Sequence, residues 1–307
     1  MHISRESFLK KTAVVGTAIM LPDSLLQISG ILEAADLPHL VVAKGKSDMV
    51  HPEKIVQSAV NSLGGMKRFI SRGDVVVVKP NMAWDRTPEF AANTNPDVVS
   101  AIVKMCFDAG AKKVKVFDHG VNDMRRCYKQ SGIQEAAARL GADVTFIDER
   151  KFKDIKIGGN SLKSWPFYTE IFEADKVINV PVAKHHSKSK LTMAMKNWMG
   201  VIGGKRSKLH WSIDESLVDL SRVIKPTLTV LDAVRILTGN GPQGGSLAYV
   251  KRLNTIVVST DQVAVDAFGT TFFGMSGEDL GYVKIAAKEK MGVMDLSRIK
   301  IERIQVS

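Results

Sequence analysis

Cysteine and aromatic residues are scarce in this chain of 307 residues, and their scarcity excludes several kinds of site. The only cysteines, Cys106 and Cys127, do not form a C-x-x-C pair, so this chain alone cannot build an iron–sulfur cluster or a cysteine-based zinc site. We predict two buried free thiols, with a disulfide as the alternative in an oxidising compartment. Aromatic residues make up only 7% of the chain and no nucleic-acid-binding motif is present, which disfavours nucleic acid as a partner.

The chain also lacks a long hydrophobic segment of the kind that spans a membrane. Its N-terminal apolar run, residues 13–21, is too short to cross a bilayer, so we expect no transmembrane helix in the mature protein. The preceding Ser4-Arg-Glu-Ser-Phe-Leu-Lys10 resembles the twin-arginine export signal, except that Glu6 replaces the second arginine. We expect residues 1–36 to be an export signal, residues 37–307 to be the folded part, and the protein to be periplasmic. A frayed helix or a retained anchor is the alternative.

Acidic residues are absent from one stretch, Lys176 to Ile213, although the chain contains 32 Asp and Glu residues. The same stretch holds eight Lys or Arg residues and three of the seven His residues. It begins as an apolar strand and continues into a basic, glycine-containing segment that we expect to be a loop. Such a strand end commonly holds an anion or a metal in α/β proteins. The net charge of +11 likewise favours anionic partners.

Strand patterns alternate with helical patterns along most of the chain. Residues 75–79 form a β-branched run typical of a strand buried on both faces, and Asn95-Pro96 is a typical helix start. We expect strands at 39–44, 75–79, 113–117, 144–147, 176–180, 227–231, 255–259 and 299–306, helices at 52–63, 96–109, 132–140, 214–223, 261–272 and 277–291, and a hairpin at 152–168. This order predicts an α/β fold with a mainly parallel sheet and helices on both faces, as one domain or two lobes.

Polar side chains follow several of the predicted strands, and in an open α/β sheet such positions meet at one edge. These residues are Lys79, Asn81, Asp118, His119, Lys184, His185, His186 and Asp232. His185 and His186 should point to opposite sides, so only one of them can face a given ligand. A divalent metal held by His119, His186, Asp118 and Asp232 is one interpretation; solvated loop side chains are the alternative.

Lys184, His186 and Lys196 are the residues that we predict to carry chemistry. A desolvated lysine can bind an anionic oxygen, act as a base or form an imine, and His186, like His119, is predicted as an acid–base group or a metal ligand; solvated lysines on a basic face are the alternative. Lys79 is also predicted to bind an anionic oxygen, and Asn81 and Asn197 to orient the ligand. Gly203, Gly204 and Asn240 lie where a backbone could approach a phosphate. Neither glycine-rich segment matches a dinucleotide or P-loop pattern. The cofactor, if any, stays unidentified.

Taken together, these motifs resemble the domain of unknown function 362 family (DUF362). The resemblance rests on Val78–Asn81, Asn95-Pro96, Asp118–Gly120, Lys184-x-His186, Met195–Asn197 with Gly200, Asn240–Pro242 with Gly245, and Asp261-x-x-Ala-x-Asp266. It implies an α/β domain of uncharacterised activity, often exported by a twin-arginine signal. Other members carry a ferredoxin-like cluster domain, for which this chain has no cysteines. The pattern Pro181-x-x-x-His185 followed by Met195–Asn197 is remotely similar to the nickel-pincer lactate racemases.

Two functional hypotheses follow. In the first, a site at the strand ends binds an anionic small molecule or a metal cofactor and has an enzymatic role. In the second, the protein is a non-enzymatic accessory protein whose basic face docks an acidic redox partner or a membrane surface. Burial distinguishes them, because the first requires the basic segment to line a cleft and the second requires it to cover a convex face.

Overall fold

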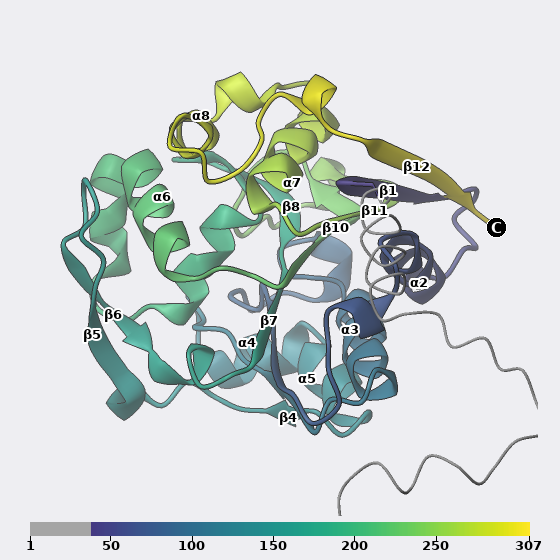
Figure 1. Ribbon diagram of the computed structural model, residues 1–307, viewed down its shortest axis with the longest axis horizontal. Helices are drawn as coiled ribbons and strands as arrows, with labels where there is room; N and C mark the ends of the chain where they lie inside the picture. Colours follow the sequence, from purple (N-terminus) through teal and green to yellow (C-terminus); the bar gives the residue numbers. More distant parts are fainter. Residues whose placement is uncertain (1–37) are drawn as a thin grey trace, which may run out of the picture. The chain divides into compact units, whose positions relative to one another are not determined.

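One ten-stranded sheet organises the part of the chain that the computed structural model describes, residues 38–307 (Figure 1). The predicted export signal lies outside these residues. The strands of the sheet are β1 (Leu40–Gly45), β2 (Val75–Pro80), β3 (Lys113–Val116), β4 (Asp143–Val144), β7 (Lys176–Val180), β8 (Val182–His186), β9 (Lys190–Thr192), β10 (Leu228–Leu237), β11 (Val250–Ser259) and β12 (Ile301–Val306). A separate hairpin pairs β5 (Phe152–Lys156) with β6 (Ser164–Tyr168), as predicted for 152–168.

The strand order β12-β1-β11-β10-β7-β2-β3-β4 confirms the predicted α/β fold with a mainly parallel sheet. Six strand pairings are parallel. The other three, β1–β11, β10–β11 and β8–β9, are antiparallel. The parallel centre formed by β7, β2 and β3 brings the carboxyl ends of these strands to the same edge, which is where the polar residues predicted from the sequence gather.

Helices cover both faces of the sheet, as predicted. One face carries α2 (Pro52–Ser62), α3 (Pro96–Asp108), α4 (Met124–Gln130) and α5 (Ile133–Ala138); the other carries α6 (Ile213–Val223), α7 (Gln262–Gly269) and α8 (Gly281–Lys288). Val76 and Val78 of β2 pack into the first core, whereas Val77 packs into a core on the second face. Successive side chains of a strand point to opposite faces, so a run of valines is needed where both faces are covered.

The free cysteines and the helix start agree with the sequence predictions. Cys106 and Cys127 are both buried and unpaired. Asn95 caps α3, since its side chain accepts a hydrogen bond from the backbone N–H of Asp97 and Pro96 occupies the first turn. Among residues 38–307, no helix combines the length and the apolar character that crossing a bilayer requires.

The largest departure from the predictions follows Pro181, where we expected a loop. Residues 182–186 instead form β8, which pairs in parallel with the second half of β10, while the first half of β10 pairs with β7. Strand β10 was expected to end at residue 231 but continues to Leu237. The additional length of β10 offers backbone hydrogen-bonding groups to β8. Residues 182–186 therefore become a strand through a tertiary contact that local sequence does not reveal.

Three smaller corrections concern element boundaries. Asp232 was expected at the end of a strand but lies within β10. The strand expected at 144–147 is only the two-residue β4, and the helix expected at 277–291 is divided into a 3₁₀ turn, Gly277–Asp279, and α8. A capping box formed by Ser276 and Asp279 starts that turn, and the extended backbone of Leu280, with φ −105° and ψ 111°, separates it from α8.

Candidate functional site

A cavity of about 630 Å³ lies where β2 and β3 end, beside β8 and β9 and two 3₁₀ segments, η6 (Met195–Val201) and η7 (Arg206–Ser212). This volume is typical of small-molecule sites, which measure roughly 300–1,000 Å³. Its wall contains the basic part of the acid-free stretch: Lys184, His186, Lys188, Lys196, Lys205, Arg206 and His210. The basic segment therefore lines a cleft.

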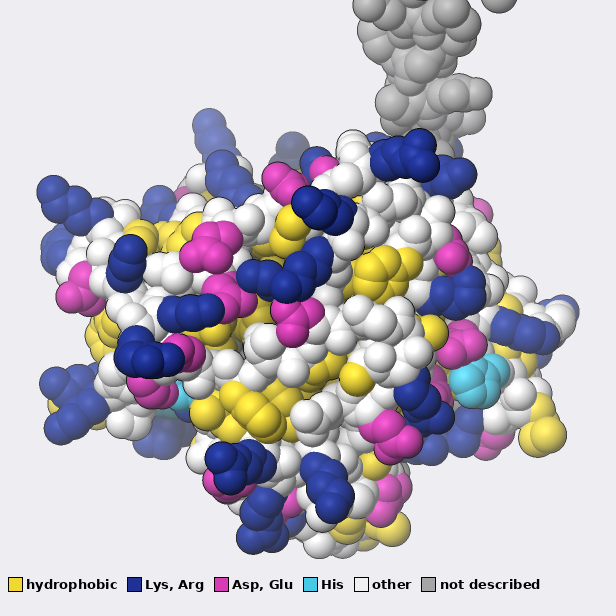
Figure 2. Space-filling view, turned by 90° about the horizontal axis from the view of Figure 1, so that it is seen from below, with side chains coloured by type: hydrophobic (Ala, Val, Ile, Leu, Met, Phe, Trp, Pro, Cys, Tyr) yellow, Lys and Arg dark blue, Asp and Glu magenta, His cyan; other side chains and the backbone are white. Residues whose placement is uncertain are grey.

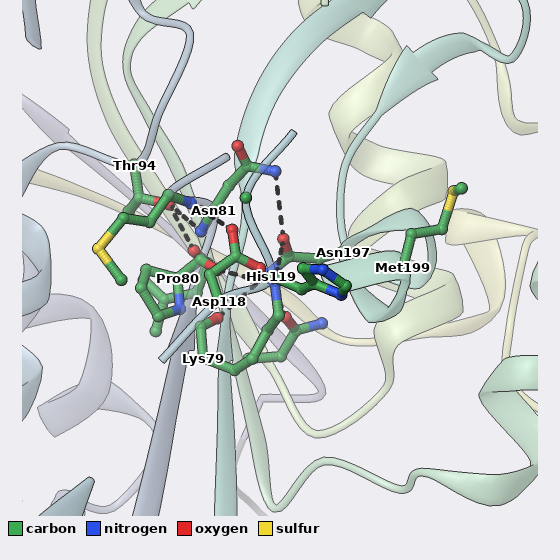
Figure 3. Close-up of polar contacts among 12 residues, drawn as sticks. Lys79, Pro80, Asn81, Thr94, Asp118, His119, Asn197 and Met199 are labelled. Atoms are coloured by element: carbon green, nitrogen blue, oxygen red, sulfur yellow. Dashed lines mark hydrogen bonds and ion pairs between the residues drawn. The ribbon is translucent and has the colours of Figure 1, made fainter. Parts of the chain in front are cut away.

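At the inner end of the site, Lys79 is completely buried and paired with a carboxylate. Its Nζ lies 2.7 Å from Asp118 Oδ1 and donates hydrogen bonds to Asn197 Oδ1 at 3.0 Å and to the Pro80 carbonyl at 2.8 Å (Figure 3). Asp118 Oδ2 accepts a hydrogen bond from the Met82 N–H at 2.6 Å. Burial lowers the pKa of Lys79, and the Asp118 carboxylate opposes that effect. This pair joins the end of β2 to the end of β3.

Gly200 is required by the same ion pair. A Cβ atom at this position would lie 1.8 Å from Asp118 Oδ1 and 2.5 Å from Lys79 Nζ, closer than any side chain allows. The backbone of η6 therefore passes directly over the pair, and the Gly200 carbonyl accepts a hydrogen bond from the His119 N–H at 2.8 Å.

Asn81 and Asn197 connect the ion pair to the cavity, and both line it. Asn197 Nδ2 donates to the Lys79 carbonyl at 3.1 Å and to Asn179 Oδ1 at 2.8 Å, while its Oδ1 accepts from Lys79 Nζ. Asn81 Oδ1 accepts from Lys184 Nζ at 3.2 Å. Each amide is thus held by protein groups, and together they fix the positions of two lysine side chains.

Lys184 on β8 is 1% exposed, and only neutral groups hydrogen-bond with its ammonium. Its Nζ donates to the Ala92 carbonyl and to Asn81 Oδ1, and lies 5.8 Å from the centre of the Trp84 ring. Burial lowers the pKa of Lys184 to about 7; Asp118 opposes this shift, and the Lys196 and Lys79 charges add to it. This amine can therefore gain or lose a proton near neutral pH.

Lys196 on η6 is 5% exposed and lines the cavity. Its Nζ has one hydrogen-bond contact, with the Met199 sulfur at 3.2 Å, and a thioether is a weak acceptor. Burial, together with repulsion by Arg206, lowers the pKa of Lys196 to about 7. This amine is less firmly held than that of Lys184, and it too can gain or lose a proton near neutral pH.

His186 is 8% exposed and lies on the same face of β8 as Lys184. Its Nδ1 accepts hydrogen bonds from the backbone N–H groups of Lys188 and Ser189 at 3.1 and 3.3 Å, which places the proton of the neutral ring on Nε2. Burial, together with the Lys196 charge, lowers the pKa of His186 to about 2, so the ring stays neutral. It stacks on His210, with ring centres 5.6 Å apart and an interplanar angle of 10°.

As the alternation rule predicts, His185 does not share this environment. It is absent from the cavity wall, and its Nδ1 accepts a hydrogen bond from the Gly241 N–H at 3.0 Å. A Cβ at Gly241 would lie 1.8 Å from the His185 carbonyl oxygen, so the glycine allows the two segments to approach.

Arg206 adds a third cation to the cavity wall. Its guanidinium donates to three carbonyl groups, of His119 at 2.8 Å, Met199 at 3.2 Å and Gly120 at 2.6 Å. Burial lowers the pKa of Arg206. His119 donates through Nδ1 to the Ile202 carbonyl at 2.8 Å, while its Nε2 lies 3.5 Å from Glu149 Oε1; burial and Arg206 lower its pKa, and Glu149 opposes that shift.

Several residues predicted from the sequence as site residues lie outside the cavity wall. Asp232 is buried, and its two oxygens accept from the N–H groups of Asn95 and Val234 at 2.7 and 2.9 Å. Lys79 is held by Asp118, behind the wall. Gly204 belongs to the wall, whereas Gly203 and Asn240 do not. Pro242, from the glycine-rich loop at residues 239–245, does line the cavity.

Among the wall residues that had not been singled out from the sequence are Trp84, Thr192, Arg206 and His210. Arg206 and His210 belong to the acid-free stretch, so its composition contained a signal for them. Thr192 had none, because only the pairing of β8 with β9 places it directly opposite Lys184. Thr192 Oγ1 is buried and has no hydrogen-bond partner among residues 38–307.

The four residues predicted to hold a metal are not assembled into one centre. Asp118, His119 and His186 line the cavity, and Asp232 does not. Within residues 38–307, no group of three or more His, Cys, Asp or Glu side chains is arranged to hold a metal ion.

The chain is similar to several known proteins. The chain is 27% identical over 247 residues to the thylakoid-associated protein sll1697 of Synechocystis, with 78% of this chain and 74% of that protein aligned. A lactate racemase apoprotein from Thermoanaerobacterium thermosaccharolyticum is structurally similar with a TM-score of 0.45 and 12% identity, over 76% of this chain and 56% of that one. Residues 76–271 match the family described as domain of unknown function (DUF362), and the chain belongs to that family.

Proposed function

We propose that this protein binds a small anionic molecule in the cavity and that Lys196 transfers protons to or from it. One observation carries the proposal. Lys184, Lys196 and Arg206 line a single cavity, and no carboxylate oxygen of residues 38–307 lies within ion-pair distance of them. A buried charge without a counter-ion is unfavourable in a folded protein. Such an arrangement is expected where a ligand supplies the opposite charge.

The contacts suggest a different role for each group. Lys184 is fixed by Asn81 and Ala92, so it is suited to hold an anionic oxygen in one position. Lys196 contacts only a thioether, so its amine can move toward a ligand and exchange a proton near neutral pH. His186 offers an Nε2–H donor rather than a base, because two backbone N–H groups occupy its Nδ1.

The test begins with the protein purified from its own source. Mass spectrometry after denaturation should reveal a co-purifying anionic molecule in stoichiometric amount, and thermal-shift screening of carboxylates and phosphate esters should show stabilisation. Both should be lost in a Lys184→Gln/Lys196→Gln variant. They should persist in Lys208→Gln, in which the replaced lysine is exposed and lies outside the wall. A parent protein that carries no anion and is stabilised by none would refute the proposal.

Binding of a divalent metal stays a prediction. Of the predicted ligands, His119 is the more suitable, since its Nδ1–H is held by a carbonyl and its Nε2 carries the lone pair, although that nitrogen lies 3.5 Å from the exposed Glu149 carboxylate. His186 is less suitable, because coordination through Nε2 would require loss of the proton on that nitrogen. Elemental analysis of the natively purified protein tests whether a metal is bound in stoichiometric amount. The same measurement on His119→Ala tests whether His119 is one of its ligands.

Docking to an acidic protein or a membrane, and export to the periplasm, also stay predictions. On the face shown in Figure 2, Lys and Arg side chains are interspersed with Asp and Glu side chains, and no single-sign patch dominates. The name of the Synechocystis relative describes it as thylakoid-associated, which is consistent with work at a membrane. Fractionation of cells that express the full chain, with Arg5→Gln as the comparison, tests both location and export.

A further inference from the structure

We infer that the natural ligand of this cavity is an organic dianion, such as a phosphate monoester or a dicarboxylate. This inference rests on the proposed function, since it specifies the charge of the anion that the same cavity binds. Three features of the wall support it: the count of uncompensated charges, the excess of hydrogen-bond donors, and the presence of apolar surface.

The charge count favours two negative charges over one. Asp118 is the only acidic side chain in the cavity wall, and it is paired with Lys79. The same wall contains two buried lysines, Lys184 and Lys196, and the half-buried Arg206, and no carboxylate of residues 38–307 lies within ion-pair distance of these three cations. A monoanion can compensate only one of them, whereas a dianion can compensate two.

The hydrogen-bonding groups also favour an oxyanion. Thr192 Oγ1 is buried without a partner, Lys196 Nζ contacts only the Met199 sulfur, and the Nε2–H of His186 has no acceptor assigned in residues 38–307. Thr192 faces Lys184 across the β8–β9 pair. These groups can all donate, and no unpaired carboxylate accompanies them. A ligand group that only accepts hydrogen bonds, as carboxylate and phosphate oxygens do, satisfies all of them.

The remaining wall indicates that the dianion has an organic body. Ala83, Trp84, Val121, Met199 and Pro242 contribute apolar surface to the cavity. Its volume of about 630 Å³ far exceeds that of an inorganic ion, and pockets of this size commonly combine apolar walls with a few polar anchors. Bare sulfate or phosphate would leave most of the space unfilled.

Two matched probe pairs test the charge requirement by isothermal titration calorimetry near pH 7. Phenyl phosphate is mainly a dianion there, since the second phosphate pKa is about 6, and benzenesulfonate is a monoanion of nearly the same shape. Succinate and succinamate differ by one carboxylate replaced with an amide. The dianion of at least one pair should bind about tenfold more tightly than its partner, as expected when a second buried charge is compensated.

The variants assign that preference to the cavity. Lys196→Gln and Lys184→Gln should each reduce the dianion preference to about twofold or less, whereas Lys208→Gln, outside the wall, should retain it. A preference confined to phenyl phosphate identifies a phosphate ester, and one confined to succinate identifies a dicarboxylate. Equal binding of monoanions and dianions overturns this inference but leaves the anion site standing. Binding of none of the four probes, together with no thermal stabilisation by any anion, overturns both proposals.

Discussion

Two buried lysines only a few ångströms from the same cavity have opposite surroundings. Lys79 lies 2.7 Å from the Asp118 carboxylate and is hydrogen-bonded to Asn197 and Pro80, whereas Lys196 contacts only the Met199 sulfur. The Lys79 charge is compensated within the protein, so it joins two strand ends. The Lys196 charge has no carboxylate within ion-pair distance among residues 38–307, so its burial is expected to reduce the stability of the folded protein. The difference between them separates the structural part of this site from the part available to a ligand.

Removing the compensated lysine should give the largest loss of stability. Lys79→Met leaves the buried Asp118 carboxylate without its counter-ion, and we expect the free energy of unfolding to fall by about 3–5 kcal/mol. Urea denaturation followed by circular dichroism measures it. In Lys79→Met/Asp118→Asn no isolated charge remains, so the double variant should recover part of the loss. A Lys79→Met variant as stable as the parent would contradict the structural role of Lys79.

Removing the uncompensated lysine should have the opposite effect. Lys196→Met preserves the length of the side chain and eliminates a buried charge, so we expect the free energy of unfolding to rise by about 1–4 kcal/mol while anion binding is lost. The same urea experiment, run without ligand, compares this variant directly with Lys79→Met. A decrease in stability would show that Lys196 has a structural partner after all.

The pH dependence of stability should sharpen the same contrast. Lys184 and Lys196 have pKa values of about 7 in the folded protein, and an unfolded lysine has one of about 10.4. Between these values the unfolded chain binds more protons, so the free energy of unfolding should increase with pH, by up to about 1.4 kcal/mol per pH unit for each lysine. Unfolding measured from pH 7 to 9 should show a smaller slope in Lys196→Met. Equal slopes would contradict the lowered pKa.

The smallest expected change in stability concerns Thr192. Its Oγ1 has no partner, so Thr192→Val should change the free energy of unfolding by no more than about 0.5 kcal/mol while weakening dianion binding up to about tenfold. Thr229 on β10 is a matched control, because its Oγ1 is also buried without a partner but lies outside the cavity wall. Thr229→Val should leave binding unchanged. Equal effects of the two substitutions would remove Thr192 from the site.

Much of the fold could be predicted from local sequence. The valine run of β2, the Asn95-Pro96 helix start and the apolar strand at 176–180 each produced the expected element. The segment after Pro181 was not predicted in this way, because β8 pairs with the extended second half of β10 as well as with the short β9. Asp232 was misplaced for the same reason, since the length of β10 depends on its neighbours.

The sequence by itself determined that the chain forms an α/β sheet, that a basic and acid-free segment follows one strand, and that Lys184, His186 and Lys196 belong to that segment. It could not show which of the three lysines Lys79, Lys184 and Lys196 has a carboxylate partner. Only the tertiary structure decided that Asp118 pairs with Lys79 while the other two have no carboxylate partner. The physical reason is that charge compensation and desolvation depend on distances between strand ends, which local sequence patterns do not encode.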